Sequence, residues 1–214
     1  MGVKEFVAPD KVEPMCKKII GISGHKQSGK TTSAEFLDSN LEKTEIVCFA
    51  DALKNIVGDC FGAETDDLYG TDSDKHKLLP CGKSIRQVLQ VVGTDWFRGL
   101  DKDCWVRAYR LHPWICSRYA FRIITPDVRF PNEVKAIQDM GGIVIRLTRT
   151  PFPEDQHESE TALDFAERDT VDKFEICAGH TIRFDHVIDN ADMTIDRQNK
   201  AVVEIVQNYL SKES

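Results

Sequence analysis

No stretch of this 214-residue chain approaches the roughly 20 consecutive apolar residues that a membrane-spanning helix needs. Its first residues, Met1 to Glu5, carry no apolar signal core. Position 6 is Phe, where a myristoylation signal has Ser or Thr. We therefore expect a cytoplasmic protein without a membrane partner.

The cysteines do not form a disulfide or metal pattern. Their number is seven, which is odd, and none of them belongs to a C-x-x-C motif. Several fall inside apolar runs, where a thiol behaves as a small apolar group. We interpret them as free thiols in a reducing compartment.

An excess of positive charge is absent as well. The chain has 28 basic and 35 acidic residues, a formal net charge of -7. A protein that binds nucleic acids without regard to sequence needs a basic face, so we expect no nucleic-acid partner. The negative net charge is still compatible with a local group of basic residues that binds phosphate.

Short apolar runs alternate with helical patterns along most of the chain, which has 41% hydrophobic residues. Residues 1–16 are polar, contain two prolines and are expected to form an N-terminal extension to a single domain, 17–214. Strands are expected at residues 18–23, 45–50, 121–127, 143–148 and 186–189. This alternation predicts an α/β fold of three layers, with a five-stranded parallel sheet and helices on both faces.

Helices are expected between these strands. One begins after the cap residue Ser84 and ends at Gly93, and another is capped by Asn132. The remaining helices are expected over residues 32–40, 51–61, 103–110 and about 202–210. The charged, irregular segment 150–185 is expected to be a surface lid.

A phosphate-binding motif follows the first strand. Residues 24–31 read Gly-His-Lys-Gln-Ser-Gly-Lys-Thr, a full match to G-x-x-x-x-G-K-T between a strand and a helix. Its glycines allow backbone N–H groups to point at phosphate oxygens, and the helix N-terminus adds partial positive charge. Lys30 is expected to bridge the outer phosphates of a triphosphate, and the Thr31 hydroxyl to bind Mg²⁺.

A second acid is expected to complete the magnesium site, and Asp127 at the end of a strand is the candidate. The alternative for Asp127 is a carboxylate that caps a loop. Arg129 lies two residues on, where it could hold a phosphate; an exposed loop arginine is the alternative. Because parallel strands end at one edge of the sheet, the loop, Asp127 and Arg149 should lie together.

Other classes of P-loop protein fit less well. No Asn-Lys-x-Asp motif is present to read guanine, and Val128 follows Asp127 where an ATPase motor has Glu. Small-molecule kinases remain, and these need additional arginines that neutralise charge and exclude water. Candidates are Arg86, Arg98, Arg129, and Arg146 or Arg149.

Several further blocks occur in order along the chain. They are residues 24–32, 49–54, 86–90, 93–95, 103–106, 127–133, Arg149, 157–160 and Asn190. On these blocks the sequence resembles the phage-type deoxynucleoside monophosphate kinases, a branch of the P-loop nucleoside monophosphate kinases. The resemblance extends from about residue 18 to 210 and implies a P-loop kinase fold with a lid at about 150–185 and an acceptor-binding region at about 51–105.

The resemblance also implies roles. ATP would be bound by Gly24, Lys26, Ser28, Gly29, Lys30, Thr31, Thr32 and Asn190, with Asn190 against the adenine. The deoxynucleoside monophosphate would be bound by Asp51, Lys54, Arg86, Gly93, Thr94, Asp95, Trp105, Arg129 and Glu160. Catalysis would rest on Lys30, Asp127, Arg129 and Arg149, and Mg²⁺ on Thr31 and Asp127. For Trp105, a place in the core is the alternative to stacking on the base.

The expected reaction is direct in-line transfer of the γ-phosphoryl group of ATP to a deoxynucleoside 5′-monophosphate. Two alternatives remain open: a kinase of another small molecule, such as dephospho-coenzyme A, and an ATP-sensing module without catalysis. A homodimer is one assembly that the sequence leaves open, as it leaves open which bases the acceptor site takes. The resemblance further suggests a viral source, and hence a host cytoplasm.

Overall fold

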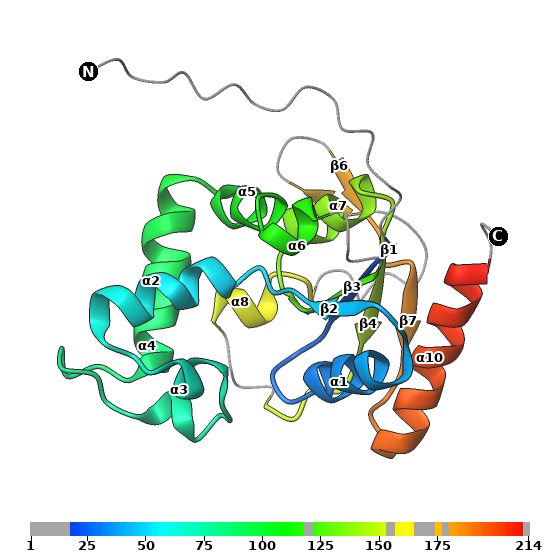
Figure 1. Cartoon of the computed structure of the whole chain (residues 1–214), viewed down its shortest axis with the longest axis horizontal. Coiled ribbons are helices and arrows are strands. Elements are labelled where there is room, and N and C mark those ends of the chain that lie inside the picture. Colours follow the sequence, from blue (N-terminus) through cyan, green and yellow to red (C-terminus); the bar gives the residue numbers. More distant parts are fainter. Residues whose placement is uncertain (1–17, 118–121, 153–156, 165–173, 177–179, 212–214) are drawn as a thin grey trace.

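The computed structural model describes residues 18–117, 122–152, 157–164, 174–176 and 180–211 (Figure 1). The expected extension, residues 1–16, lies outside them, as do parts of the expected lid. Among the described residues, no helix is long and apolar enough to cross a membrane. Five cysteines fall within this part of the chain, and all five are free thiols, as expected.

Five parallel strands form the central sheet, which confirms the predicted α/β architecture. Their order is β2-β3-β1-β4-β7. They are β1 (Lys18–Ser23), β2 (Thr44–Ile46), β3 (Arg122–Val128), β4 (Ile143–Leu147) and β7 (His186–Ile188). β2 is shorter than predicted. The three central strands β3, β1 and β4 are almost continuously buried, as expected where helices cover both faces.

Alternate residues of each central strand face two different helical layers. Ile20 of β1 belongs to a core cluster with α1 (Lys30–Asn40) and α10 (Ile195–Ser211). Its neighbour Ile19 belongs to a second cluster with α5 (Cys104–Arg110) and α7 (Pro131–Asp139). The period-two alternation of strand side chains thus produces the three layers.

A helical region with its own core stands beside the sheet, at the left in Figure 1. It consists of α2 (Asp51–Phe61), α3 (Thr65–Tyr69), η1 (Asp74–His76), α4 (Ile85–Gln90) and the π-helical segment η2 (Val91–Arg98). The apolar stripe of α2, Leu53 and Val57, packs there against Val88 and Val92. This region coincides with the segment expected to bind the acceptor.

Gly93 does not end a helix, which corrects the sequence prediction. Ser84 caps α4 in a capping box with Gln87, as predicted, but the chain continues helically as η2 to Arg98. A Cβ on Gly93 would lie 2.6 Å from Leu53 Cδ2, so glycine is needed here for close helix packing. Gly93 thus meets a packing requirement and is not a stop signal.

The N-cap of α7 also differs from the prediction, because Phe130 and not Asn132 occupies it. The helix begins at Pro131, and the Glu133 carboxylate accepts the backbone N–H of Phe130 at 3.0 Å. Asn132 lies inside the first turn, where its amide donates to the carbonyl of Lys102 and to Asp103. Pro131 and Glu133 are the better signals, because proline suits the first turn and the N3 carboxylate satisfies free N–H groups.

The expected lid contains more regular structure than predicted. α8 (Glu158–Thr161) lies in it, and β5 (Phe174–Ile176) pairs antiparallel with β6 (His180–Ile182). Ile182 and Phe184 belong to the core cluster beneath α7. A short helix that was not predicted, α6 (Pro113–Cys116), follows α5.

Candidate active site

The motif at residues 24–31 joins β1 to α1 in a tight loop. Gln27 has φ 57° and Gly29 has φ 99°, and left-handed residues of this kind turn successive N–H groups toward one point. Gly24 has φ 155°, and a Cβ there would lie 2.5 Å from Ser28 Oγ. The backbone geometry is therefore that of an anion-binding loop.

Lys30 lies across the inside of this loop and is 7% exposed. Its Nζ donates to the carbonyl oxygens of Gly24 at 2.7 Å and His25 at 2.6 Å. Burial and the nearby charge of Arg129 lower the pKa of Lys30 to about 7. An anion bound in the loop would reverse this effect by favouring the ammonium form.

A buried polar network supports the loop from below. The fully buried Asn190, after β7, donates to the Ser28 carbonyl at 2.8 Å and to Gln198 Oε1 at 2.6 Å. Gln198 of α10 in turn donates to the Gly29 carbonyl and to Ser33 Oγ. Asn190, expected against the adenine, is thus within hydrogen-bonding distance of the loop itself.

Sequence reasoning missed Gln198, although a signal was available. It precedes Val202 and Val206 by four and eight residues, so it falls on the buried stripe of α10. A polar residue at a core position of an amphipathic helix needs internal hydrogen-bond partners. The loop and Asn190 supply them here.

The sequence left open whether Arg146 or Arg149 serves the site, and the two arginines have different partners in the structure. Arg149 donates to the Asn190 carbonyl at 2.8 Å through Nη2 and also to the carbonyl of Met193. Arg146, 2% exposed, donates to Ser23 Oγ at 3.1 Å and pairs with Asp164 at 3.3 Å. Arg149 therefore binds the loop after β7, whereas Arg146 lies beneath the phosphate loop.

Asp127 lies at the end of β3, as predicted. Its two carboxylate oxygens accept the backbone N–H groups of Phe49 at 3.0 Å and Ala50 at 2.9 Å, just before α2. Burial raises the pKa of Asp127 above its ordinary value. One carboxylate thus connects the sheet edge, close to Lys30, with the start of the helical region.

Arg129 and Glu160 meet at the mouth of the loop. The Arg129 guanidinium forms an ion pair with Glu160 and donates to the Ser159 carbonyl at 3.2 Å. The other Glu160 oxygen accepts the backbone N–H of Lys26 at 2.8 Å. The structure therefore brings Arg129, Glu160 and the phosphate loop together, from three distant parts of the chain.

Arg86 of α4 reaches toward the loop through a shared carboxylate. Asp72 forms ion pairs with Arg86 and, at 2.9 Å, with Lys26 Nζ. Partial burial opposes ionisation of Asp72, but Lys26 and Arg86 hold its pKa below the ordinary value. Asp72 was not singled out in the sequence, because an acid in a polar loop has no pattern.

Asp51 and Lys54 lie at the start of α2. Asp51 accepts the Cys48 N–H and the Tyr69 hydroxyl, each at 2.8 Å, and Lys54 Nζ lies 3.7 Å from the Tyr69 ring centroid. Half of the Tyr69 side chain remains exposed, so these three residues line an accessible surface of the helical region.

Trp105 belongs to the core of the helical region, which is the alternative that the sequence left open. The side chain is 6% exposed, packs against Phe97, and donates from its indole N–H to the Gly93 carbonyl at 2.9 Å.

Of the other residues expected at the acceptor site on η2, Thr94 is half-buried and Asp95 is exposed. Arg98 pairs with the buried Glu133 and stacks on Phe130, so it stabilises the fold at this edge.

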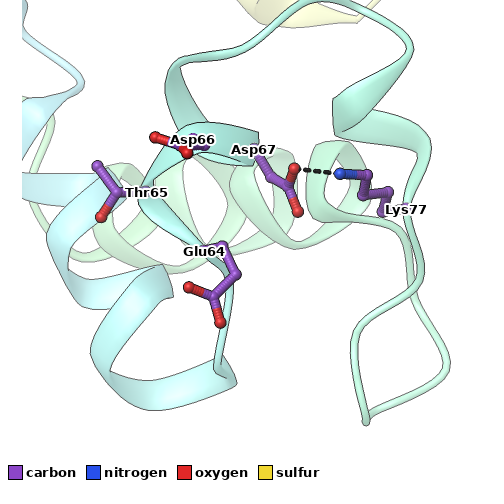
Figure 2. A pocket seen from close by; sticks show the side chains of 5 residues that line it. All are labelled: Glu64, Thr65, Asp66, Asp67 and Lys77. Atoms are coloured by element: carbon purple, nitrogen blue, oxygen red, sulfur yellow. Dashed lines mark hydrogen bonds and ion pairs between the residues drawn. The ribbon is translucent and has the colours of Figure 1, made fainter.

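One hollow of about 410 Å³, at α3, is lined by none of the site residues described above (Figure 2). It is lined by Glu64, Thr65, Asp66, Asp67 and Lys77, and Lys77 is already paired with Asp67. Three carboxylates against one amine would repel a phosphate, so this hollow is not suited to a nucleotide.

Two residues near the phosphate loop, Thr31 and Asp127, decide whether a divalent metal fits there. Within the described ranges, no cluster of three or more His, Cys, Asp or Glu could hold a metal alone. Mg²⁺ at phosphate sites needs only one or two protein oxygens beside the substrate phosphates. Thr31, exposed in the first turn of α1, and Asp127, whose oxygens retain further lone pairs, fit that requirement.

Comparison with known proteins places the chain in a family. The family model for deoxynucleotide monophosphate kinase matches residues 81–175. A protein of Acanthamoeba polyphaga mimivirus that bears the same family name is 33% identical over 166 residues, covering 68% of this chain and 81% of that protein. The chain belongs to the deoxynucleotide monophosphate kinase family.

Two further similarities accompany this assignment. The deoxynucleotide monophosphate kinase of Escherichia phage RB69 is 33% identical over 92 residues, which are 41% of this chain and 37% of that enzyme. A solved shikimate kinase from Acinetobacter baumannii in complex with shikimate aligns with a TM-score of 0.48 and 13% identity, over 92% of this chain and 96% of that one. The family membership makes this chain a nucleotide kinase of the P-loop type.

Proposed function

We propose that this family member transfers the γ-phosphoryl group of ATP to a deoxynucleoside 5′-monophosphate, giving the diphosphate and ADP. One observation carries the proposal: cations from two parts of the molecule meet at the loop. Lys30 and Arg129 come from the sheet edge, and Arg86 comes from the helical region, where Asp72 links it to Lys26. Donor and acceptor phosphates would therefore be held next to each other.

On the donor side, the loop N–H groups and Lys30 bind the phosphates of ATP, and Thr32 follows in the first turn of α1. Asn190 holds the Ser28 carbonyl and so fixes the curvature of the loop. Arg149 orders the segment after β7 through the carbonyl of Asn190, beside which the adenine would lie. The role of Arg149 is therefore to position the segment that follows β7.

On the acceptor side, Arg86 and Arg129 bind the monophosphate. Asp51 and Lys54, with Tyr69, form the surface of the helical region that faces sugar and base, and Thr94 and Asp95 extend it along η2. Gly93 and Trp105 maintain the packing of this region.

Transfer needs no general base, because the acceptor phosphate is already anionic at neutral pH. Its oxygen attacks the γ-phosphorus in line, and the bond from that phosphorus to the β,γ-bridging oxygen breaks. Lys30 and Arg129 stabilise the charge that spreads over the transferred group, and holding both substrates in line removes much of the entropic barrier.

Mg²⁺, when bound through Thr31 and Asp127, would neutralise charge on the donor phosphates. Asp127 has a second role that does not depend on a metal. By accepting the N–H groups of Phe49 and Ala50, it fixes the start of α2 relative to the loop.

The test is to follow ADP formation from ATP and Mg²⁺ with a panel of nucleoside and deoxynucleoside monophosphates. Turnover with deoxynucleotides is expected. No ADP above background with any monophosphate would refute the proposal, and turnover with dephospho-coenzyme A alone would favour another small-molecule kinase. Equal use of ribonucleotides would reject only the preference for deoxyribose.

A residue-level test separates the two sides of the site. Arg86→Ala should raise the KM for the monophosphate by about 10- to 100-fold, because a hydrogen bond to a charged group contributes about 1.5–3 kcal/mol. The KM for ATP should change little. Arg107→Ala removes a surface arginine that pairs with exposed Asp101 and should leave both values unchanged. An unchanged acceptor KM in Arg86→Ala would show that its assignment is wrong.

A further inference from the structure

An internal carboxylate occupies the mouth of the phosphate loop. Glu160 is 7% exposed, and its oxygens accept the Lys26 N–H and pair with the Arg129 guanidinium. Burial opposes ionisation, but Arg129 and Lys30 hold the pKa of Glu160 below its ordinary value. The carboxylate is therefore an anion at an anion-binding site.

These contacts match those of a phosphate oxygen. In a P-loop, the backbone N–H groups and nearby cations are the groups that bind the phosphates of a nucleotide. Glu160 uses one such N–H group and one such cation, and it lies close enough to Lys30 to affect its charge. A phosphate at the Lys26 N–H and the Glu160 carboxylate would repel each other across a buried space.

A second carboxylate anchors the same segment without using the loop N–H groups. Asp164, four residues after Glu160, lies 2.9 Å from His25 Nε2 and 3.3 Å from Arg146 Nη2. His25 belongs to the loop, and Arg146 lies beneath it, where it donates to Ser23 Oγ. Displacement of Glu160 would therefore leave α8 attached to the loop through Asp164.

We propose that Glu160 is an internal substitute for a donor phosphate and occupies the subsite at the Lys26 N–H in the nucleotide-free protein. Polyphosphate displaces Glu160 from this subsite, and the displacement releases Arg129 for the transferring group. The inference rests on the proposed function and extends it. Glu160 holds Arg129 in place while the site is empty, and it lowers the affinity for the donor by competing with it.

The experiment measures binding of inorganic tripolyphosphate to the whole chain by calorimetry, without acceptor or turnover. Glu160→Gln keeps the size of the side chain and removes its charge, so affinity should increase about tenfold, equivalent to about 1.4 kcal/mol. Glu160→Ala removes the competing group altogether and should show the same direction. Glu158→Gln changes an exposed carboxylate of the same helix and should bind like the wild type.

A gain of affinity is informative because structural damage to the loop would lower affinity. Unchanged or weaker binding in both Glu160 variants would overturn the proposal, as would an equal gain in Glu158→Gln, which would reflect net charge alone. Failure of the proposed function is distinguishable, since it would show as absent ADP formation with every monophosphate while Glu160→Gln still bound tripolyphosphate more tightly.

Discussion

Binding of ATP should be accompanied by protonation of Lys30. In the ligand-free protein, burial and Arg129 lower the pKa of Lys30 to about 7. The negative phosphates that it contacts on binding favour the ammonium form and raise this pKa. Above pH 7, ATP must therefore bind together with a proton.

The magnitude follows from the value of the pKa. At pH 8 a lysine of pKa about 7 is about nine-tenths neutral, so about 0.9 proton should be taken up per ATP bound. At the same time, the affinity should fall about tenfold for each pH unit above 7, which corresponds to about 1.4 kcal/mol. At pH 8 the terminal phosphate contributes little, because its own pKa is about 6.

Calorimetry in buffers of different ionisation enthalpy measures this uptake directly. The charged groups that act on Lys30 are Arg129, Glu160, Arg146 and Asp127. Lys30→Arg is the matched control, since arginine stays charged and should bind ATP without proton uptake or pH dependence. Binding enthalpies of the wild type that are independent of the buffer at pH 8 would refute the reasoning.

Three further predictions concern packing, the polar network and the metal. Gly93→Ala should lower the free energy of unfolding by about 1–3 kcal/mol, because its Cβ would lie 2.6 Å from Leu53 Cδ2. The control Gly99→Ala places a Cβ where nothing lies within 4 Å, so it should be neutral or slightly stabilising. Urea unfolding of both variants measures the difference. Gln198→Leu should cost about 3 kcal/mol and weaken ATP binding, since it leaves buried partners unsatisfied, and the exposed Gln207→Leu on the same helix should do neither. Thr31→Val should raise the Mg²⁺ concentration for half-maximal activity about tenfold or more. Thr31→Ser retains the hydroxyl and should need the same Mg²⁺ concentration as the wild type. Equal Mg²⁺ concentrations for half-maximal activity in the two variants would exclude Thr31 as a ligand.

Local sequence signals were sufficient where one segment satisfies its own physical requirements. The strand, the glycine-rich loop and the helix at residues 18–40 were predicted because apolar runs, left-handed glycines and helical spacing each act over a few residues. The capping box at Ser84 was predicted for the same reason. The period and order of these elements also predicted the parallel sheet.

Local sequence signals gave wrong helix boundaries where one residue type can serve two structural purposes. Gly93 was expected to end a helix but permits Leu53 to pack against η2, and Asn132 was expected to cap α7 but binds the carbonyl of Lys102. Both errors arise from contacts with residues more than ten positions away. No local pattern contains that information.

The sequence by itself determined the three-layer fold and the phosphate loop, because these depend on short-range spacing and on the edge at which parallel strands end. Only the tertiary structure decided which charges meet. It showed that Glu160 reaches the Lys26 N–H, that Asp72 joins Arg86 to Lys26, and that Gln198 supports Gly29. Side chains so far apart in the chain are brought within hydrogen-bonding distance by burial of the core, and their pairing leaves no periodic trace in the sequence.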